Sequence, residues 1–289
     1  DTTKFFIQDV VATKSLVSLF DFENKLLIFQ SVAPVMKFCL FTRGHGLRPT
    51  TEAAEFVFFA HAVEDLRDIE RRFTLTTDDI ALLNPNTHTC PIFRSRRDAE
   101  LTKTIYRRVP VLTREARDGR PEENPWDIRF STMLHMSNDS HLFRTREQLE
   151  TDGWRLDGNI FRKADEEYLP LYEAKLFHQF NHRPSTFDGI PEADRFQMKA
   201  PTIAISSDQL SDPYYAVLPR FWVHRHEVDE ACRTLSTVRW FITFRGMTNV
   251  MTNSRNSVFS VLPRVAVGNS APICILGQPE LAFAFLSAV

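Results

Sequence analysis

The sequence predicts an α/β fold at its start, followed by a mixed α+β fold. Three short apolar segments, at residues 16–22, 37–42 and 55–60, are bounded by polar or turn residues, as buried strands are. Helical patterns and short strands then alternate irregularly over the rest of the 289 residues. We therefore expect an α/β domain over residues 1–62 and an α+β domain over residues 63–289.

The first of these regions is expected to end in a hairpin. A Gly/Pro-containing loop at 43–49 joins the second and third strands, and such a pair is typical of the closing edge of an α/β sheet. Next, Thr76–Asp79 predicts the N-cap of a short helix that continues to Leu83, and Asn84-Pro85 should end it.

A longer helix is predicted over Arg96–Arg108. Its apolar residues Leu101, Ile105 and Val109 recur every four positions, as on one face of an amphipathic helix. The polar segment at 118–125 contains Pro and Gly and is expected to be a linker or an exposed loop.

The remaining elements follow from the same patterns. Pro219 indicates an edge position for the strand that contains it. We expect helices over 144–152 and 227–235, with Gly153 after the first, and strands over 160–163, 168–172, 217–223, 239–245 and 257–267.

Composition excludes several classes of protein. At 43% hydrophobic and 25% charged residues the chain is typical of globular proteins. It has no apolar stretch long enough to span a bilayer and no signal-peptide pattern. The four scattered cysteines are expected to be free thiols, so we expect a cytoplasmic protein. The missing initial Met and the uncapped apolar C-terminal end predict a fragment truncated at both ends.

Charge is concentrated in one window. Between Pro91 and Arg120 nine Lys/Arg stand against four acids, a net charge of +5 in a chain whose formal charge is −2. A local positive field of this kind suits a polyanion such as DNA. The alternative is a solvated helix face with i,i+4 ion pairs, and charge alone does not decide between them. The expected phosphate contacts are Arg94, Arg96, Arg97, Lys103 and Arg107.

Two further segments are rich in side chains that read base edges or bind phosphate. The first is His178–Arg183, from which we select His178, Gln179 and Arg183; a polar helix end explains it equally well. The second precedes the last predicted strand and supplies Asn253 and Arg255, with a long capped turn as the alternative.

The other motifs in the sequence predict no metal-binding or catalytic site. His224 and His226 alternate, but no third ligand at a regular spacing accompanies them, so no metal site is predicted. No phosphate-binding loop and no nucleophile motif is present. Asn84-Pro-Asn-Thr87 resembles the N-P-P-Y signature of amino-methyltransferases, but Thr87 has no aromatic face on which a flipped base can stack. We therefore interpret it as a turn.

Ordered blocks along the chain resemble the C-terminal part of bacterial restriction-modification adenine methyltransferases. The block around Arg94–Asp98 is the most specific of them. The matching blocks are Leu16–Asn24, Lys37–Leu40, Asn84–Thr102, Tyr168–Lys175 with His178–Phe180 and His182-Arg183, the scattered positions Arg245, Thr248, Thr252-Asn253 and Arg255, and Val261–Gly268. The family pattern has an acid where Asn181 and Gly246 stand, which leaves the roles of Arg183 and Arg245 open.

The resemblance implies a specific organisation. Residues 1–62 would be the closing strands of a Rossmann-like class I methyltransferase sheet, and residues 63–289 an incomplete target recognition domain. The parent enzyme would transfer a methyl group from S-adenosylmethionine to an adenine flipped out of double-stranded DNA. The cofactor motif and N-P-P-Y would lie upstream of this chain, so the fragment alone is predicted to be inactive, with no catalytic residue of its own.

Three functions stay open at this stage. The chain is a fragment of such an enzyme, with restriction or defence-system subunits as possible partners and no membrane partner. Alternatively it is a non-catalytic nucleic-acid-binding module of a defence complex, or a protein-interaction domain whose basic helix binds an acidic partner. An N-P-P-Y and a glycine-rich strand–turn–helix in the upstream reading frame would favour the enzyme over the module.

Overall fold

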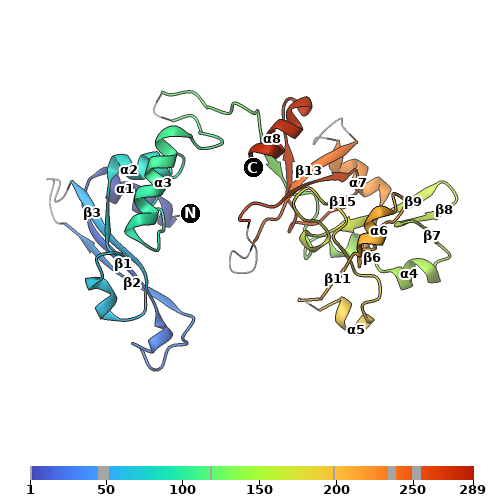
Figure 1. The fold of residues 1–289 in the computed structure, drawn as a ribbon, viewed down its shortest axis with the longest axis horizontal. Helices are drawn as coiled ribbons and strands as arrows, with labels where there is room; N and C mark the ends of the chain where they lie inside the picture. The colour runs from blue at the N-terminus through green and yellow to red at the C-terminus, as the bar shows by residue number, and fades with distance from the viewer. Residues whose placement is uncertain (1, 45–51, 118, 198, 234–238, 249–254) are drawn as a thin grey trace. The chain divides into compact units, whose positions relative to one another are not determined.

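The computed structural model is a mixed α/β structure with several sheets (Figure 1). It describes residues 2–44, 52–117, 119–197, 199–233, 239–248 and 255–289. The chain divides into two compact units, Asp1–Pro125 (unit 1) and Trp126–Val289 (unit 2).

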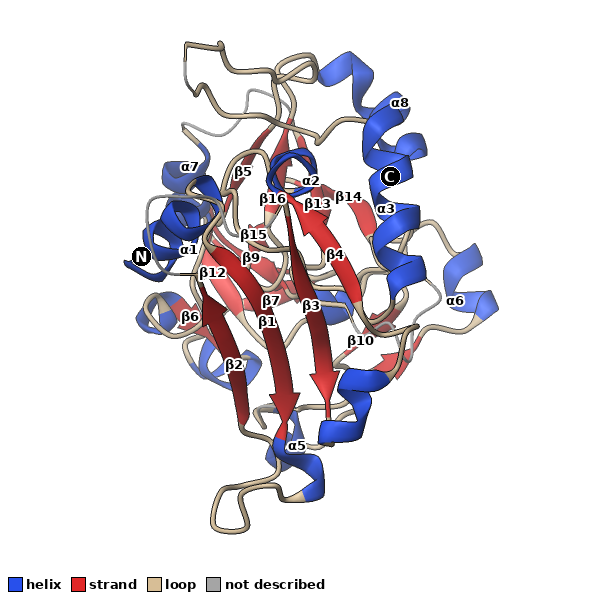
Figure 2. Cartoon of the chain, turned by 90° about the vertical axis from the view of Figure 1, so that its left-hand side faces the viewer, coloured by secondary structure: helices blue, strands red, loops and turns tan. Residues whose placement is uncertain are grey.

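Unit 1 is built on a four-stranded sheet with the strand order β2-β1-β3-β4 (Figure 2). Its elements in chain order are α1 (Thr2–Ala12), β1 (Leu16–Glu23), β2 (Lys37–Arg43), β3 (Ala53–Ala60), β4 (Phe73–Thr76), α2 (Thr77–Leu83) and α3 (Arg96–Arg108). The three apolar segments predicted to be strands are therefore confirmed as β1, β2 and β3, and both predicted helices as α2 and α3.

The pairing of these strands differs from the expected hairpin. β2 pairs antiparallel with β1, whereas β3 pairs parallel with β1 on its other side. The hairpin thus joins β1 and β2 through residues 24–36, and the predicted hairpin of β2 and β3 is wrong. The longer β1–β2 loop closes back on itself around Asn24, so it can form a hairpin without a short Gly/Pro turn. The predicted loop at 43–49 lies mostly outside the described residues.

Helices cover one face of the sheet in unit 1. Val10 of α1, Ile80 of α2 and Ala99 of α3 pack against Phe56 and Phe73 in one buried cluster. A bulge between Leu16 and Ser18 changes which side chains of β1 face this cluster. The opposite face holds a smaller cluster of Phe22, Val57 and Ala60.

Unit 2 contains three sheets. The largest has the order β6-β12-β9-β8-β7 with β15 also paired to β9, the second has the order β14-β13-β16-β5, and β10 pairs with β11. Its elements in chain order are β5 (Arg129–Ser131), β6 (Phe143–Arg144), α4 (Arg146–Thr151), β7 (Arg155–Asp157), β8 (Ile160–Lys163), β9 (Glu166–Tyr172), β10 (Ser185–Thr186), α5 (Glu192–Arg195), β11 (Ile203–Ala204), α6 (Ser207–Ser211), β12 (Trp222–His224), α7 (Arg225–Cys232), β13 (Trp240–Phe244), β14 (Phe259–Pro263), β15 (Ala266–Val267), β16 (Ile273–Ile275) and α8 (Ala282–Ala288).

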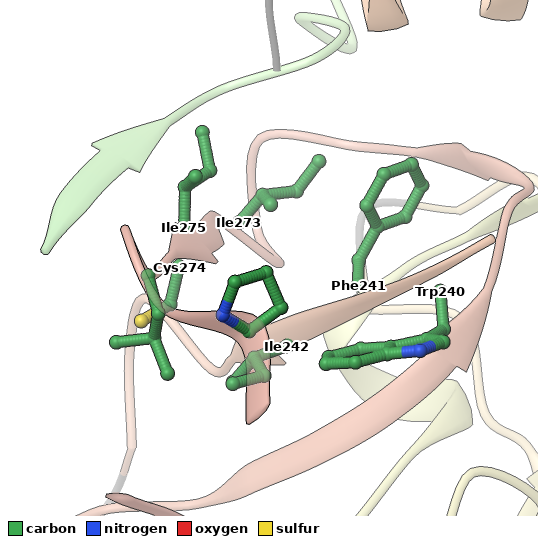
Figure 3. Close-up of a pocket in the computed structure, with 8 residues that line it drawn as sticks. Trp240, Phe241, Ile242, Ile273, Cys274 and Ile275 are labelled. Carbon is green, nitrogen blue, oxygen red and sulfur yellow. The ribbon is translucent and has the colours of Figure 1, made fainter. Parts of the chain in front are cut away.

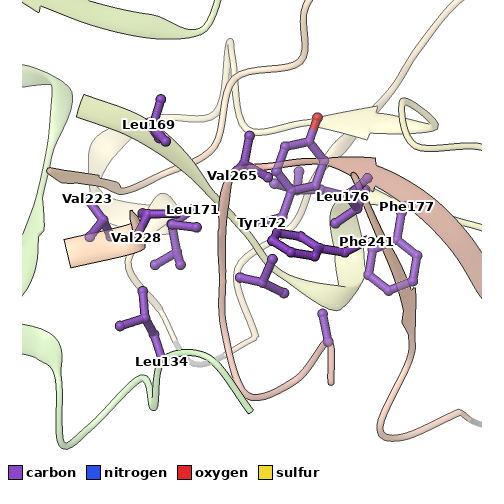
Figure 4. Packing of buried hydrophobic residues seen from close by; sticks show 14 of the residues in the cluster. Leu134, Leu169, Leu171, Tyr172, Leu176, Phe177, Val223, Val228, Phe241 and Val265 are labelled. Carbon is purple, nitrogen blue, oxygen red and sulfur yellow. The ribbon is translucent and has the colours of Figure 1, made fainter. Parts of the chain in front are cut away.

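The core of unit 2 lies around β9. Figure 4 shows Leu169, Leu171 and Tyr172 of this strand packed with Val223 and Val265, all at most 6% exposed. The predicted strands and helices of this region are present, although several are shorter than expected. The strand after Pro219 begins only at Trp222 and pairs on both sides, with β6 and β9, so the predicted edge position is wrong.

The division between the units does not fall at residue 62. β4 extends the first sheet by pairing with β3, and α2 and α3 bury their inner faces on that sheet, so residues 63–125 belong to the same compact unit as residues 1–62. The unit boundary instead follows the 118–125 segment that the sequence predicts to be a linker.

Among the described residues, no helix has the length and apolar character that crossing a bilayer requires.

Glu23 at the end of β1 is surrounded by two lysines and a histidine. Its carboxylate lies 2.6 Å from Lys25 Nζ, 3.4 Å from Lys37 Nζ and 3.1 Å from His61 Nε2. Hydrogen bonding to Lys25, and then to His61, lowers the pKa of Glu23 from 4.5 to about 2. The ionised carboxylate therefore ties the start of the β1–β2 loop to both strands.

Replacing Glu23 should change stability in a pH-dependent way. A lowered folded-state pKa contributes stability that is present above pH 4.5 and is lost as the pH falls through about 2. Glu23→Gln should therefore be less stable than the parent chain at pH 7, and the difference should vanish by about pH 2. Denaturant unfolding across this range measures it. The control is Glu52→Gln, whose exposed carboxylate should matter little at any pH; a pH-independent effect of Glu23→Gln would contradict the assignment.

Candidate nucleic-acid interface

The basic helix α3 begins and ends where the sequence predicts. The hydroxyl of Ser95 accepts a hydrogen bond from the backbone N–H of Asp98 at 3.1 Å and caps the helix. The backbone N–H of Arg96 donates to the carbonyl of Glu70 at 2.7 Å, which fixes the entry of the helix to the preceding segment.

The apolar repeat of the α3 region faces outward. Leu101, Ile105 and Val109 are 57%, 48% and 61% exposed, whereas Ala99 and Lys103 are buried. The inward face of α3 is therefore formed by Ala99 and Lys103.

Lys103 is held in the interior by carboxylates. Its ammonium lies 2.8 Å from Glu100 and 3.6 Å from Asp79 of α2, and its side chain is only 9% exposed. Arg107 lies 3.5 Å from the same Asp79 but keeps a 59% exposed side chain. Lys103 thus joins α2 to α3 and is not placed for a phosphate contact, whereas Arg107 can still reach solvent.

The other predicted phosphate contacts lie on the surface. Arg94, Arg96 and Arg97 are exposed, and within the described residues none of them forms an ion pair. Arg108 at the end of the helix shares both properties. The Arg94 guanidinium lies 4.3 Å from the ring centroid of Phe59, so a cation–π contact positions it. We call Arg94, Arg96, Arg97 and Arg108 the basic surface.

A tight turn in unit 2 holds the second predicted group. The backbone N–H of His178 donates to the carbonyl of Asn181 at 2.7 Å, and that of Asn181 donates back to His178 at 2.9 Å. The N–H of Phe180 donates to the carbonyl of Phe259 on β14 at 2.9 Å. Gln179 Oε1 accepts from the N–H of Phe259 at 2.7 Å. Four hydrogen bonds thus fix the turn and dock it on β14.

Phe180 at the tip of this turn is the residue that sequence reasoning missed. Its side chain is 62% exposed although its backbone lies in the left-handed region, at φ 58°. Both features are unfavourable for a bulky aromatic residue, and glycine would avoid both. The positive φ has no signature in the sequence; only the polar residues around Phe180 point to the turn.

Cations surround the turn. Burial, with further contributions from Arg245 and Arg255, lowers the pKa of His178, which favours its neutral form. Arg245 is half-buried because its guanidinium donates to the carbonyl of Phe177, at 3.2 Å from Nε. Arg255 is exposed. The turn thus has an exposed aromatic ring at Phe180 and two guanidinium groups near His178, features suited to stacking bases and binding phosphate.

Gln179 leaves a polar group without a partner. Its amide nitrogen Nε2 is buried and makes no hydrogen bond within the described residues, while its Oε1 is used by Phe259. A buried donor of this kind costs about 1–3 kcal/mol. A ligand acceptor reaching the turn would satisfy it.

Arg183 has a structural role, because its guanidinium is used by backbone carbonyls. Its guanidinium donates to the carbonyls of Asp212, Tyr215 and Leu210 at 2.9, 2.8 and 3.1 Å. These bonds leave it fixed on the segment before β12 and unsuited to reading bases. Asn253 lies outside the described residues.

The turn at Asn84–Thr87 acts as a clamp within unit 1. The side chain of Asn86 donates to the carbonyl of Thr113 at 3.0 Å and accepts from the N–H of Glu115 at 2.9 Å. Asn84 Nδ2 donates to the carbonyl of Thr89 at 2.8 Å. Both Asn side chains are thus used by the backbone, which agrees with the interpretation of this motif as a turn.

His224 caps a helix. Its Nδ1 accepts from the backbone N–H of His226 at 3.3 Å at the start of α7, and its ring packs edge-on against Tyr168. In the part of the chain that the structure describes, no group of three or more His, Cys, Asp or Glu could hold a metal ion.

The hollow between β13 and β16 is small. Figure 3 shows it lined by Trp240, Phe241, Ile242 and Ile273, with a cavity volume of about 20 Å³. That is space for about one water molecule, so neither a nucleobase nor S-adenosylmethionine fits there.

Comparison with family models, curated proteins and solved structures gives no significant match for this chain.

Replacing Lys103 by alanine should lower the stability of the protein, whereas replacing Arg97 should leave it almost unchanged. Lys103→Ala leaves Asp79 facing α3 with one cation fewer and should lower the free energy of unfolding by about 1–3 kcal/mol. Arg97→Ala removes an exposed and unpaired charge, so its stability should change by less than about 0.5 kcal/mol. Denaturant unfolding measures both. Equal stability losses in the two variants would contradict the inward placement of Lys103.

Proposed function

We propose that the chain is part of a site-specific adenine DNA methyltransferase of a restriction-modification or phage-defence system, and that this part binds double-stranded DNA. The observation that carries the proposal is the His178–Asn181 turn, which displays the exposed ring of Phe180 and has Arg245 and Arg255 near His178. The basic surface supplies a second set of unpaired arginines, on unit 1.

The DNA contacts divide by chemistry. Arg94, Arg96 and Arg97 would bind phosphates, which gives affinity without sequence preference. The turn would contact bases through the exposed ring of Phe180, with Arg255 on a neighbouring phosphate. Arg183 and Lys103 support these surfaces from within and make no DNA contact in this proposal.

Methyl transfer is assigned to a part of the parent enzyme outside this chain. The sequence has no glycine-rich strand–turn–helix element, and the hollow between β13 and β16 does not fit S-adenosylmethionine. No chemical step is therefore derived for the described residues. The parallel pair β1 and β3 beside the antiparallel β2 supports placing β1–β3 at the end of a methyltransferase sheet.

A protein-interaction function is the second candidate, and one observation favours it. The exposed Leu101, Ile105 and Val109 form an apolar ridge on the outer face of α3, with Arg97 and Arg108 on the same side of the helix. DNA phosphates would use the arginines and leave the ridge in water, whereas an acidic amphipathic helix would use both. Ile105→Gln distinguishes the two functions. It should leave DNA affinity unchanged but weaken the binding of an acidic amphipathic helix.

DNA binding should depend on salt and on the basic surface. Arg96→Ala combined with Arg97→Ala should weaken binding to duplex DNA and reduce the slope of log affinity against log salt by about 2, since each phosphate contact contributes about 0.9. Fluorescence anisotropy over a salt series measures this. Arg129→Ala with Arg155→Ala removes two exposed arginines of unit 2 and is the charge-matched control. Salt-independent binding, or no binding by the chain, would overturn the proposal.

Replacing Phe180 should weaken DNA binding without lowering the stability of the fold. Phe180→Gly relieves the left-handed strain and should keep or raise the free energy of unfolding, by up to about 1 kcal/mol. The same change should weaken DNA binding by roughly 5- to 100-fold, because a stacked base contributes about 1–3 kcal/mol. Phe180→Asn, which tolerates this backbone but has no aromatic face, should behave alike. A destabilised Phe180→Gly with unchanged DNA affinity would show that the ring serves the fold.

A further inference from the structure

The loop between β1 and β2 displays apolar side chains in an ordered shape. Over residues 24–36 and on β2, eight large apolar side chains are between 39% and 84% exposed. They are Leu26, Leu27, Ile28, Phe29, Val32, Val35, Met36 and Leu40. We call this set the apolar patch. Loops are normally polar, so seven such residues in one connection need a physical reason.

Asn24 holds the loop in this shape. Its fully buried side chain donates to the carbonyls of Phe29 at 2.9 Å and Val32 at 2.7 Å, and accepts from the N–H of Phe29 at 3.0 Å. Its own N–H donates to the carbonyl of Met36 at 3.0 Å. The ring of Phe29 packs edge-on against Phe38 of β2, with ring centroids 4.8 Å apart. The loop is thus preorganised, which lowers the entropy cost of binding a partner.

β2 adds an open edge beside the patch. It stands at the end of the sheet and pairs only with β1 among the described strands (Figure 2). Its centre, Phe38–Thr42, has neither a charge nor a proline, the devices that usually protect an edge. Five of its seven residues are exposed. Unpaired backbone groups next to exposed apolar side chains are what an added strand binds.

The size of the apolar patch suits a protein partner. Eight side chains about half exposed, at roughly 150 Å² each, present on the order of 600 Å² of apolar surface. A stable interface buries about 800 Å² on each partner. Backbone hydrogen bonds along β2 would supply the polar part of such an interface.

Charge argues against a second copy of this chain as the occupant. β2 has a cation at each end, Lys37 and Arg43, and the sequence has no acid from Asn24 to Thr51. Antiparallel pairing of two β2 strands about a two-fold axis places Lys37 opposite Arg43 of the other copy, which is repulsive. These cations are compensated only in part, since Glu23 is shared between Lys25 and Lys37 and Asp9 lies 3.9 Å from Arg43 on an exposed side chain.

We propose that β2 and the apolar patch form a docking site for an extended segment of another polypeptide, which adds a strand to the sheet. The segment is apolar in its centre and acidic at its ends, to match Lys37 and Arg43. No residue of this docking site belongs to the basic surface or to the His178–Asn181 turn, although Lys37 and Arg94 contact the ring of the same Phe59. The proposal therefore does not rest on DNA binding.

A peptide display selection on the immobilised chain tests the site. The probe is a library of random peptides long enough to pair along the seven residues of β2. The selected peptides should carry apolar centres with Asp or Glu at the ends. They should also slow the reaction of exposed Cys39, in the middle of β2, with a maleimide. Selection of no peptide, or of peptides that leave Cys39 fully reactive, would overturn the proposal.

Variants locate the binding. Val35→Asp and Leu40→Asp place a charge in the apolar patch and should each weaken the selected peptides at least about tenfold, with little loss of stability because both side chains are exposed. Arg43→Glu should weaken them by opposing their acidic ends. Ile69→Asp, on an apolar side chain 73% exposed but outside the patch, is the control and should have no effect.

The oligomeric state tests the alternative that a second copy of this chain occupies the site. Sedimentation should show a monomer whose mass does not change in Leu40→Asp. A dimer that Leu40→Asp dissociates would assign the site to a second copy and overturn the proposal. Peptide binding that survives both Val35→Asp and Leu40→Asp would place the interface elsewhere.

Discussion

The orientation of α3 depends on one carboxylate, Asp79. Its Oδ2 accepts the backbone N–H of Thr76 at 3.2 Å and so closes the capping box that starts α2. The same side chain lies 3.6 Å from Lys103 and 3.5 Å from Arg107 on α3. Asp79 therefore fixes the start of one helix and the rotation of the next. With Lys103 turned inward, Arg97 and Arg108 must point outward together with the apolar ridge between them.

The boundaries of the elements in unit 1 follow from local chemistry and were predictable. Thr76 is a good cap and predicted the start of α2, while the repeat of Leu101, Ile105 and Val109 predicted α3, whose cap is Ser95. The rotation of α3 was not predictable from apolar periodicity. Ala99 and Lys103 are four residues apart, as Leu101 and Ile105 are, so both faces satisfy a helical repeat. The choice between them depends on Asp79, which is distant in sequence and enters only in three dimensions.

The same limit applies to strand pairing and to the candidate site. Asn24 makes the β1–β2 hairpin possible through contacts with residues five and eight positions away, and no turn motif announces it. In unit 2 the sequence predicted a polar segment at His178–Arg183 but could not assign roles within it. Arg183 serves three backbone carbonyls, whereas Phe180, which composition passed over, lies at the exposed tip. Residue types were enough to select the His178–Arg183 segment, whereas the role of each residue in it depends on tertiary contacts.

Backbone strain gives the proposed surfaces a common feature. Three bulky apolar residues with positive φ are Leu27 at 53°, Phe59 at 57° and Phe180 at 58°. Leu27 belongs to the apolar patch, the ring of Phe59 supports Arg94, and Phe180 forms the tip of the turn. Glycine would relieve each strain, yet a large side chain is present at all three positions. Since Leu27 and Phe180 are also exposed, burial does not offset their strain, and contact with a partner at each proposed site would account for it.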